Sequence, residues 1–165
     1  MTSAAPRLPW ASERAAEAYL HQGQVVAFAT PTVITTVLGS CVSVCLWDAG
    51  EGTGGMNHFL LPEAPAGETA SLRYAEPAFE KLLARLLALR ARHERLQAKL
   101  FGGAALAAAP DTTPLGARNV EAARRLLEAH RIPLVAEDTG GSSGRKLLFE
   151  TQMGTAWVRF LGERQ

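Results

Sequence analysis

Cysteine is scarce in this sequence, and it has neither long apolar runs nor a surplus of charge of one sign. The two cysteines, Cys41 and Cys45, lie four positions apart, which gives no disulfide framework for a small secreted domain. We therefore interpret both as free thiols. Apolar runs such as 104–110 fall far short of the roughly 20 residues that a membrane helix requires, and residues 1–10 lack the features of a secretory signal. These absences predict a cytoplasmic protein without membrane insertion.

The charge balance excludes the most common electrostatic partners. The chain has 17 basic and 16 acidic residues, a formal net charge of +1, and its basic residues are interspersed with glutamates. No basic stripe of the kind that binds nucleic acid or an anionic membrane is present. With 165 residues, 47% of them apolar and 20% charged, the chain is predicted to form a single domain over 1–165 with a real core.

Apolar periodicity predicts a layered α/β domain. Helical spacing over 73–93 and 118–130 indicates two longer helices, and 11–21 is predicted to form a short helix capped by Ser12. β-branched and apolar segments predict strands at 25–28, 33–37, 56–61, 96–101, 134–137, 147–151 and 156–161, the last two as a hairpin around Gly154; 42–47 is either a strand or a short buried helix. Turns are expected at 38–40 and 50–55. The helices are expected to cover the sheet.

Two glycine-rich segments imitate phosphate-binding loops. GEGTGG (50–55) satisfies G-x-G-x-x-G, but the segment after it is a short apolar strand that stops at Pro62, whereas a dinucleotide loop must open a helix. GGSSGRK (140–146) has the wrong spacing for a P-loop, and no Ser or Thr follows Lys146. Neither segment predicts a cofactor site.

One cysteine and one histidine stand out as candidates for catalysis. Cys41 follows Gly39 and Ser40, small residues that allow a tight turn, an exposed thiol and converging N–H groups for an oxyanion. His58 is the only histidine in an apolar, strand-like segment, since the others fall near polar helix ends. From these residues alone, Cys–His catalysis stands beside two alternatives, a structural histidine and a packed cysteine.

Five segments of the chain carry a family resemblance. They are TTVLGSCV (35–42), GGMNHFLLP (54–62), GGA (102–104), GARNV (116–120) and AEDTGG (136–141). In this order they resemble the signature segments of the chemoreceptor glutamine deamidases, the CheD family. The likeness covers about 25–161, which places the domain core at about 24–161 and leaves 1–23 as an N-terminal leader.

The resemblance implies an activity and a set of catalytic residues. It implies an α/β/β sandwich of mixed sheets, as in cysteine-hydrolase deamidases, and a cofactor-free site formed by Cys41, by His58 seventeen residues later, and by Thr35 six residues before the cysteine. The substrates implied are glutamines in the cytoplasmic helical bundle of methyl-accepting chemoreceptors, with glutamyl methyl esters as a further candidate. It also implies a CheC-type phosphatase as a partner in some relatives.

The chemistry expected of these residues is amide hydrolysis. A thiol is mostly protonated at neutral pH, so a thiolate–imidazolium pair of Cys41 with His58 would raise its reactive fraction. Thr35 is expected to hydrogen-bond and orient the His58 ring, and the turn at Gly39 and Ser40 to present the Cys41 N–H to the oxyanion.

Further residues are assigned roles near this site, and alternative interpretations of the chain are kept alongside the catalytic assignment. Gly140, Gly141 and Arg145 are expected to shape the rim that admits the substrate. Cys45 is either a resolving thiol or, as we favour, a small core residue. A metal site has too few ligands among these side chains. The rival function is a chemotaxis adaptor that binds receptors or a CheC-type phosphatase without needing catalysis.

Overall fold

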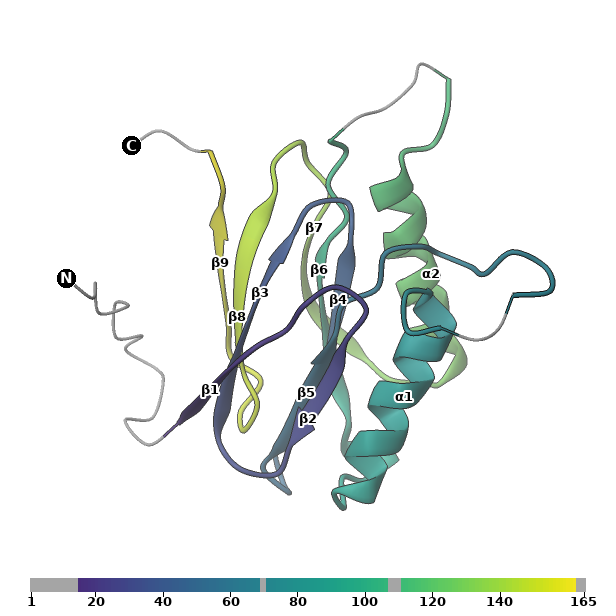
Figure 1. Ribbon diagram of the computed structural model, residues 1–165. Coiled ribbons are helices and arrows are strands. Elements are labelled where there is room, and N and C mark those ends of the chain that lie inside the picture. Colours follow the sequence, from purple (N-terminus) through teal and green to yellow (C-terminus); the bar gives the residue numbers. More distant parts are fainter. Residues whose placement is uncertain (1–14, 69–70, 107–110, 163–165) are drawn as a thin grey trace.

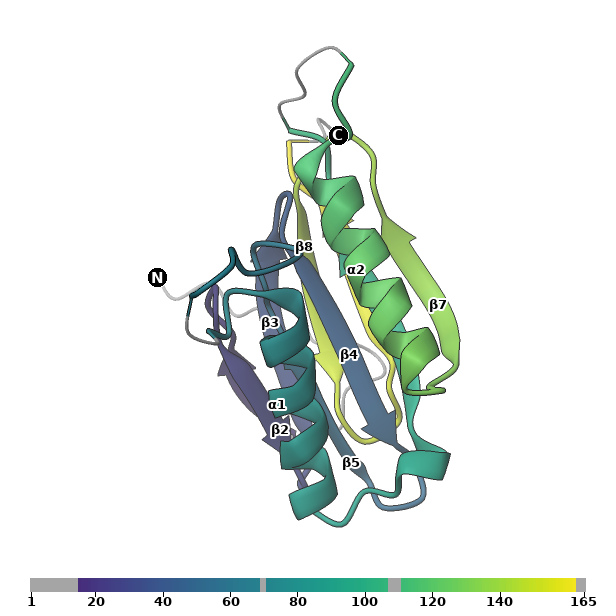
Figure 2. The ribbon, with the colours of Figure 1, turned by 90° about the vertical axis from the view of Figure 1, so that its right-hand side faces the viewer.

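The computed structural model describes residues 15–68, 71–106 and 111–162 as three stacked layers (Figure 1). A five-stranded sheet in the order β2-β5-β4-β6-β7 forms the middle layer, and a four-stranded sheet in the order β1-β3-β8-β9 covers one of its faces. Two helices, α1 and α2, cover the other face and lie side by side over β4 (Figure 2). This arrangement confirms the predicted single α/β layered fold.

Both sheets are mixed. The strands are β1 (Ala16–Tyr19), β2 (Val25–Phe28), β3 (Thr32–Leu38), β4 (Val42–Asp48), β5 (Thr53–Asn57), β6 (Gln97–Gly102), β7 (Leu134–Thr139), β8 (Arg145–Glu150) and β9 (Ala156–Phe160). The pairs β1–β3 and β6–β7 are parallel, whereas the other neighbours pair antiparallel. The hairpin predicted around Gly154 joins β8 to β9. Residues 42–47, predicted to form either a strand or a short buried helix, belong to strand β4.

The helices lie within the predicted ranges or close to them. Helix α1 (Ala75–Ala88) has Pro77 in its first turn, where a missing N–H does not interrupt the helical hydrogen bonds, and α2 (Leu115–Ala129) begins three residues before its predicted start. A short 3₁₀ helix, η1 (His93–Arg95), leads into β6. No helix among the described residues is long and apolar enough to span a membrane.

Strand alternation divides the core into two apolar clusters. Along β4, Val42, Val44 and Leu46 point toward the helices, whereas Cys45 and Trp47 point toward the four-stranded sheet. One cluster therefore fills the space under the helices and the other fills the space between the sheets. The second cluster surrounds the candidate site.

The N-terminal prediction was wrong. Within the predicted helix 11–21, residues 16–19 form β1, which pairs with β3, and Leu20 is fully buried; Ser12 and residues 11–14 lie outside the described residues. Residues 16–19 of the segment assigned to a leader are therefore part of the four-stranded sheet. Exposed and half-buried residues dominate β1, so the sequence around it carries little periodic apolar signal.

The second difference concerns the glycines of 50–55. Gly54 and Gly55 belong to β5 rather than to a turn, and this strand, not a helix, follows the G-x-G-x-x-G pattern. A Cβ at Gly54 would lie 2.4 Å from the Thr151 carbonyl oxygen. Glycine is therefore required here by the close approach of two backbones, which the sequence does not reveal. Beyond Asn57, the predicted strand continues only as isolated bridges at Phe59 and Leu61.

Packing of α1 on the middle sheet predicts a large difference between two leucines of one helix. Leu82 is fully buried, whereas Leu87 is 42% exposed. Leu82→Ala is expected to lower the free energy of unfolding by about 3 kcal/mol, because it leaves a cavity, and Leu87→Ala by about 0.5 kcal/mol or less. Urea denaturation of both variants measures this difference. Equal losses would contradict the packing described here.

Candidate functional site

Cys41 lies where the chain passes from one sheet to the other. Strand β3 belongs to the four-stranded sheet and β4 to the five-stranded sheet, and Gly39, Ser40 and Cys41 connect them. The cysteine is 9% exposed, at the end of the apolar cluster between the sheets. Its backbone N–H makes no backbone hydrogen bond to the described residues. No backbone carbonyl of the described residues therefore competes for this donor, which can face a developing oxyanion.

The turn that carries Cys41 is held by the segment after β6. The N–H of Gly103 donates to the Cys41 carbonyl and the N–H of Ala104 to the Gly39 carbonyl, each at 2.9 Å. Gly102 has a φ of 103°, and a Cβ there would lie 2.3 Å from the Cys41 carbonyl oxygen. Only glycine permits this approach, which fixes the backbone at Cys41.

Strand register places His58 beside Cys41. Val42 and Phe59 exchange two backbone hydrogen bonds, at 3.2 and 3.1 Å, and this bridge continues the register of β4 with β5. Because side chains alternate, those of Cys41 and His58 project from the same face of the sheet, into the space between the sheets. They are diagonal neighbours across the pair, with Cα atoms about 7–8 Å apart, a separation that an imidazole ring can span.

A threonine from the opposite sheet fixes the imidazole. His58 is 2% exposed, and its Nδ1 lies 2.8 Å from Thr36 Oγ1. The Thr36 hydroxyl donates its one proton to the Leu20 carbonyl at 2.7 Å. Thr36 Oγ1 must therefore accept from His58, which places the ring proton on Nδ1. Nε2 then carries a lone pair, and this buried atom has no hydrogen-bond partner among the described residues.

Thr35 does not make the contact that the family spacing assigned to it. Strand alternation directs Thr36 inward with Ile34 and Leu38, all three fully buried, and directs Thr35 to the other face, where it is half-buried. The ring-orienting hydrogen bond is therefore made by Thr36. The period of two along β3 shows that adjacent threonines face opposite ways. Both faces of the strand carry apolar residues, however, so the sequence does not tell which threonine points inward.

The predicted rim residues are joined to the same turn. Gly140 N–H donates to the Gly102 carbonyl at 2.9 Å, and Ala105 N–H donates to the Gly141 carbonyl at 2.8 Å. Arg145 is 1% exposed; it donates to the Asp138 carbonyl at 2.7 Å, and also to the Asp138 carboxylate and the Gly140 carbonyl. The guanidinium is thus held by hydrogen bonds within the loop that carries Gly140 and Gly141.

Comparison with known proteins identifies the family. Residues 60–160 match a family model described as CheD chemotactic sensory transduction. A relative from Anaeromyxobacter dehalogenans, named "Probable chemoreceptor glutamine deamidase CheD 1", is 48% identical over 147 residues, 88% of this chain and 85% of its own. The chain belongs to the CheD family. CheD relatives from Trichlorobacter lovleyi and Rhodospirillum rubrum are 47% and 45% identical, over 82% and 86% of this chain and 85% and 80% of their own.

Burial keeps both reactive groups of this CheD family member neutral at rest. Desolvation raises the pKa of the Cys41 thiol, and the backbone hydrogen bond at Cys41 opposes this rise. Desolvation, followed by the charge of His21, lowers the pKa of His58 from 6.5 to about 4. A resting thiolate–imidazolium pair is therefore disfavoured in the folded chain.

Cys45 is a core residue. It is fully buried and lies four positions along β4 from Cys41, about 13 Å at the usual strand rise. A disulfide needs Cα atoms within about 7 Å, so these two cysteines cannot form one without unfolding the strand. Among the described residues, no three His, Cys, Asp or Glu side chains gather as metal ligands.

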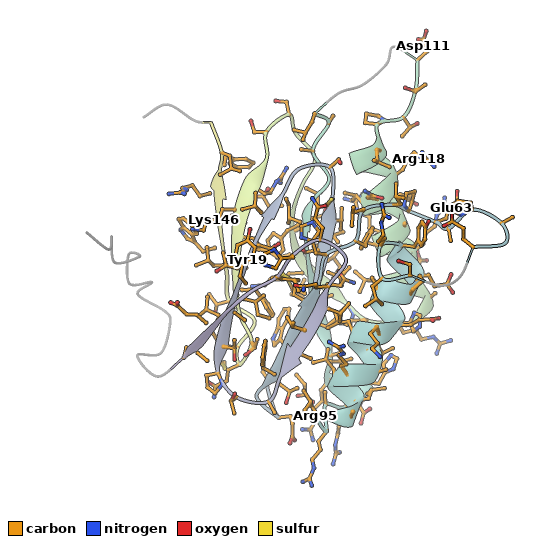
Figure 3. The ribbon with its side chains drawn as sticks, viewed as in Figure 1. Tyr19, Glu63, Arg95, Asp111, Arg118 and Lys146 are labelled. Atoms are coloured by element: carbon orange, nitrogen blue, oxygen red, sulfur yellow. The ribbon has the colours of Figure 1, made fainter. Side chains whose placement is uncertain are left out.

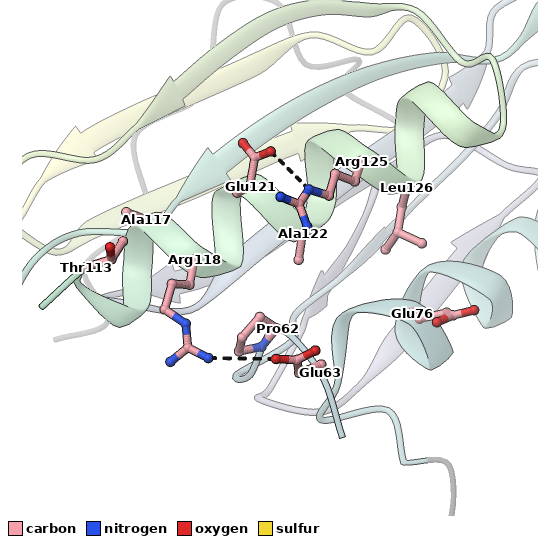
Figure 4. A pocket seen from close by; sticks show the side chains of 10 residues that line it. All are labelled: Pro62, Glu63, Glu76, Thr113, Ala117, Arg118, Glu121, Ala122, Arg125 and Leu126. Carbon is pink, nitrogen blue, oxygen red and sulfur yellow. Dashed lines mark hydrogen bonds and ion pairs between the residues drawn. The ribbon is translucent and has the colours of Figure 1, made fainter. Parts of the chain in front are cut away.

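Two surface hollows lie among the described residues, and the smaller of them borders the turn that carries Cys41. A groove of about 470 Å³ runs between α2 and the segment at Pro62 (Figure 4). Glu63 and Arg118, 4.0 Å apart, project from this helix-bearing side, opposite Lys146 (Figure 3). A second hollow of about 320 Å³ is lined in part by Gly103 and Gly141. Neither hollow is lined by Cys41 or His58, so the candidate site is defined by these two side chains and not by a cavity.

The buried imidazole predicts a pH dependence of stability. Between about pH 6.5 and 4 the unfolded chain binds a proton at His58 and the folded chain does not. The free energy of unfolding should therefore fall as the pH drops through this window, by up to about 3 kcal/mol. His58→Gln removes this term and leaves the carboxylates unchanged, so urea unfolding from pH 7.5 to 4 should show a smaller loss for the variant. Parallel losses would contradict the buried, neutral ring.

Proposed function

We propose that this chain is a protein-glutamine deamidase that converts glutamine side chains of methyl-accepting chemoreceptors to glutamate with release of ammonia. The observation that carries the proposal is the unpartnered, buried Nε2 of His58, on the face shared with Cys41. The family membership and the printed names of the relatives support this substrate class. The site of action is the cytoplasm, where the resemblance places the helical bundle of the receptors.

The first half of the reaction forms a thioester. His58 Nε2 takes the proton from Cys41 Sγ, and the thiolate attacks the carboxamide carbon. The negative charge that develops on the amide oxygen is stabilised by the Cys41 N–H at the turn formed by Gly39 and Ser40. The imidazolium then protonates the amide nitrogen, the C–N bond breaks, and ammonia leaves. The neutral ring is restored in the Nδ1–H form by its hydrogen bond to Thr36.

The second half hydrolyses the thioester. His58 Nε2 deprotonates a water molecule that attacks the thioester carbon, and the C–S bond breaks. The proton returns to the sulfur and regenerates the thiol, while the substrate leaves as glutamate.

Thr36 takes the role assigned to Thr35 on family spacing, because Thr36 carries the hydrogen bond to the ring. Gly140 and Gly141 lie on the loop beside this turn and fit a rim for the substrate side chain.

The adaptor reading predicts a different dependence on Cys41. A protein that only binds receptors, or a CheC-type phosphatase, needs no nucleophile and no oriented base. Cys41→Ala should abolish deamidation of a purified receptor cytoplasmic fragment, with a loss on the order of 10³-fold or more, and leave binding of the fragment intact. Peptide mass spectrometry measures the mass gain at each glutamine, and a pull-down measures binding. Equal gain with both proteins, or none with either, would remove the enzyme and favour the adaptor.

Two adjacent threonines provide a matched test of ring orientation. Thr36→Val removes the hydrogen bond to His58 and is expected to lower kcat by about tenfold, the equivalent of one neutral hydrogen bond. Thr35→Val changes the same side chain on the opposite face of β3 and is expected to alter kcat by less than about twofold. Steady-state deamidation of the receptor fragment compares them. A larger loss for Thr35→Val would return the orienting role to Thr35.

A further inference from the structure

A buried asparagine on α2 links the two segments that carry the reactive side chains. Asn119 is fully buried, and its Nδ2 donates to the carbonyl oxygens of Ser40 at 3.0 Å and Leu60 at 2.9 Å. These acceptors lie 79 and 59 residues away in the sequence. Ser40 immediately precedes the nucleophile, and Leu60 lies two residues beyond His58. We call this pair of hydrogen bonds the Asn119 clamp.

The clamp acts where the strand pairing stops. The last bridge between the segments is that of Val42 with Phe59. A continuing antiparallel ladder would next join the Ser40 carbonyl to the N–H of Leu61. That N–H donates instead to the Arg73 carbonyl at 3.1 Å, as does the N–H of Leu60 at 2.8 Å. The two segments therefore separate at the level of Cys41, and the asparagine amide joins them again.

The chemistry of the clamp favours asparagine. One primary amide nitrogen carries two N–H groups, one for each carbonyl, whereas a carboxylate supplies none and a hydroxyl supplies one. The helix that presents it is seated closely, since a Cβ at Gly116 would lie 2.4 Å from the Gly103 carbonyl oxygen. The Asn119 Oδ1 is buried and has no partner among the described residues. An unpaired acceptor costs stability, so a position kept for packing alone would favour an apolar side chain.

We propose that Asn119 is a positioning residue that holds Cys41 within reach of His58. The Ser40 carbonyl belongs to the segment that carries Cys41, and the Leu60 carbonyl belongs to the segment that carries His58. Because both carbonyls bind the same nitrogen, the distance between the two segments is fixed at this level. The inference rests on the proposed function, because it assumes that the thiol and imidazole react as a pair. It adds a residue from α2 that touches neither the substrate nor the reacting atoms.

A double-mutant cycle on thiol reactivity tests the clamp. The rate of Cys41 alkylation by iodoacetamide is measured from pH 6 to 9 by tandem mass spectrometry, which distinguishes Cys41 from the buried Cys45. His58→Ala is expected to slow alkylation at neutral pH by about tenfold or more in the wild-type background, because the base is lost. In the Asn119→Ala background the same change is expected to have less than about a twofold effect, because the base is already out of reach.

Matched variants separate positioning from stability. Leu127→Ala, a buried residue two turns along α2, removes core packing but keeps the clamp, and should retain the full effect of His58→Ala. Asn119→Ser, which keeps a polar side chain but cannot reach both carbonyls, is carried through the same cycle, with near-UV circular dichroism confirming the fold. An undiminished His58 effect in either Asn119 background would overturn the clamp. No His58 effect in the wild type would instead remove the Cys–His pair itself.

Discussion

A hydrogen bond from His58 Nδ1 to Thr36 Oγ1 crosses the space between the two sheets, and the geometry of the site depends on it. The histidine comes from the middle sheet and the threonine from the outer one, and both are buried. Because Leu20 accepts the only hydroxyl proton, the direction of the bond is set, and with it the tautomer of the ring. The segment around β1 thereby determines which nitrogen of His58 is basic, although it lies far from the nucleophile in the sequence.

Close backbone packing supplies the second constraint. The carbonyl of Cys41 lies against Gly102, and the carbonyls of Gly103 and Ala104 lie against Gly116 at the start of α2. Side chains at these glycines would push the layers apart, so the turn, the end of β6 and the helix are held as one unit. Cys41 is consequently held by backbone contacts with the end of β6 and, through it, with α2. Precision of this kind suits chemistry in which a small displacement of the reacting atoms is costly.

Apolar periodicity predicts local structure, but it does not predict contacts between residues that are far apart in the sequence. The layered fold, the two helices and most strands are predicted by apolar periodicity, and the segments around Cys41 and His58 carry the family resemblance. The choice between Thr35 and Thr36 depends on which face of β3 meets the other sheet, and spacing along the chain does not report that. Strand β1 is stabilised by pairing with β3 and not by its own pattern, so it was mistaken for a helix.

Asn119 illustrates the same limit at the functional site. Its segment resembles the family, yet the side chain acts through carbonyls of Ser40 and Leu60, and backbone acceptors leave no trace in the sequence.

Burial of the reactive pair connects stability to the proposed chemistry. Desolvation raises the pKa of Cys41 and lowers that of His58, so the charge-separated pair is the less stable form in the empty site. A bound amide changes this balance, because its oxygen takes up the charge of the thiolate as the C–S bond forms and the Cys41 N–H can then stabilise it. Activation therefore depends on an acceptor that reaches a cysteine residue only 9% exposed. A carboxamide at the end of a slender, flexible side chain satisfies that requirement, whereas a backbone amide within a folded helix does not. The low exposure of Cys41 thus fits the proposed attack on glutamine side chains better than attack on peptide bonds.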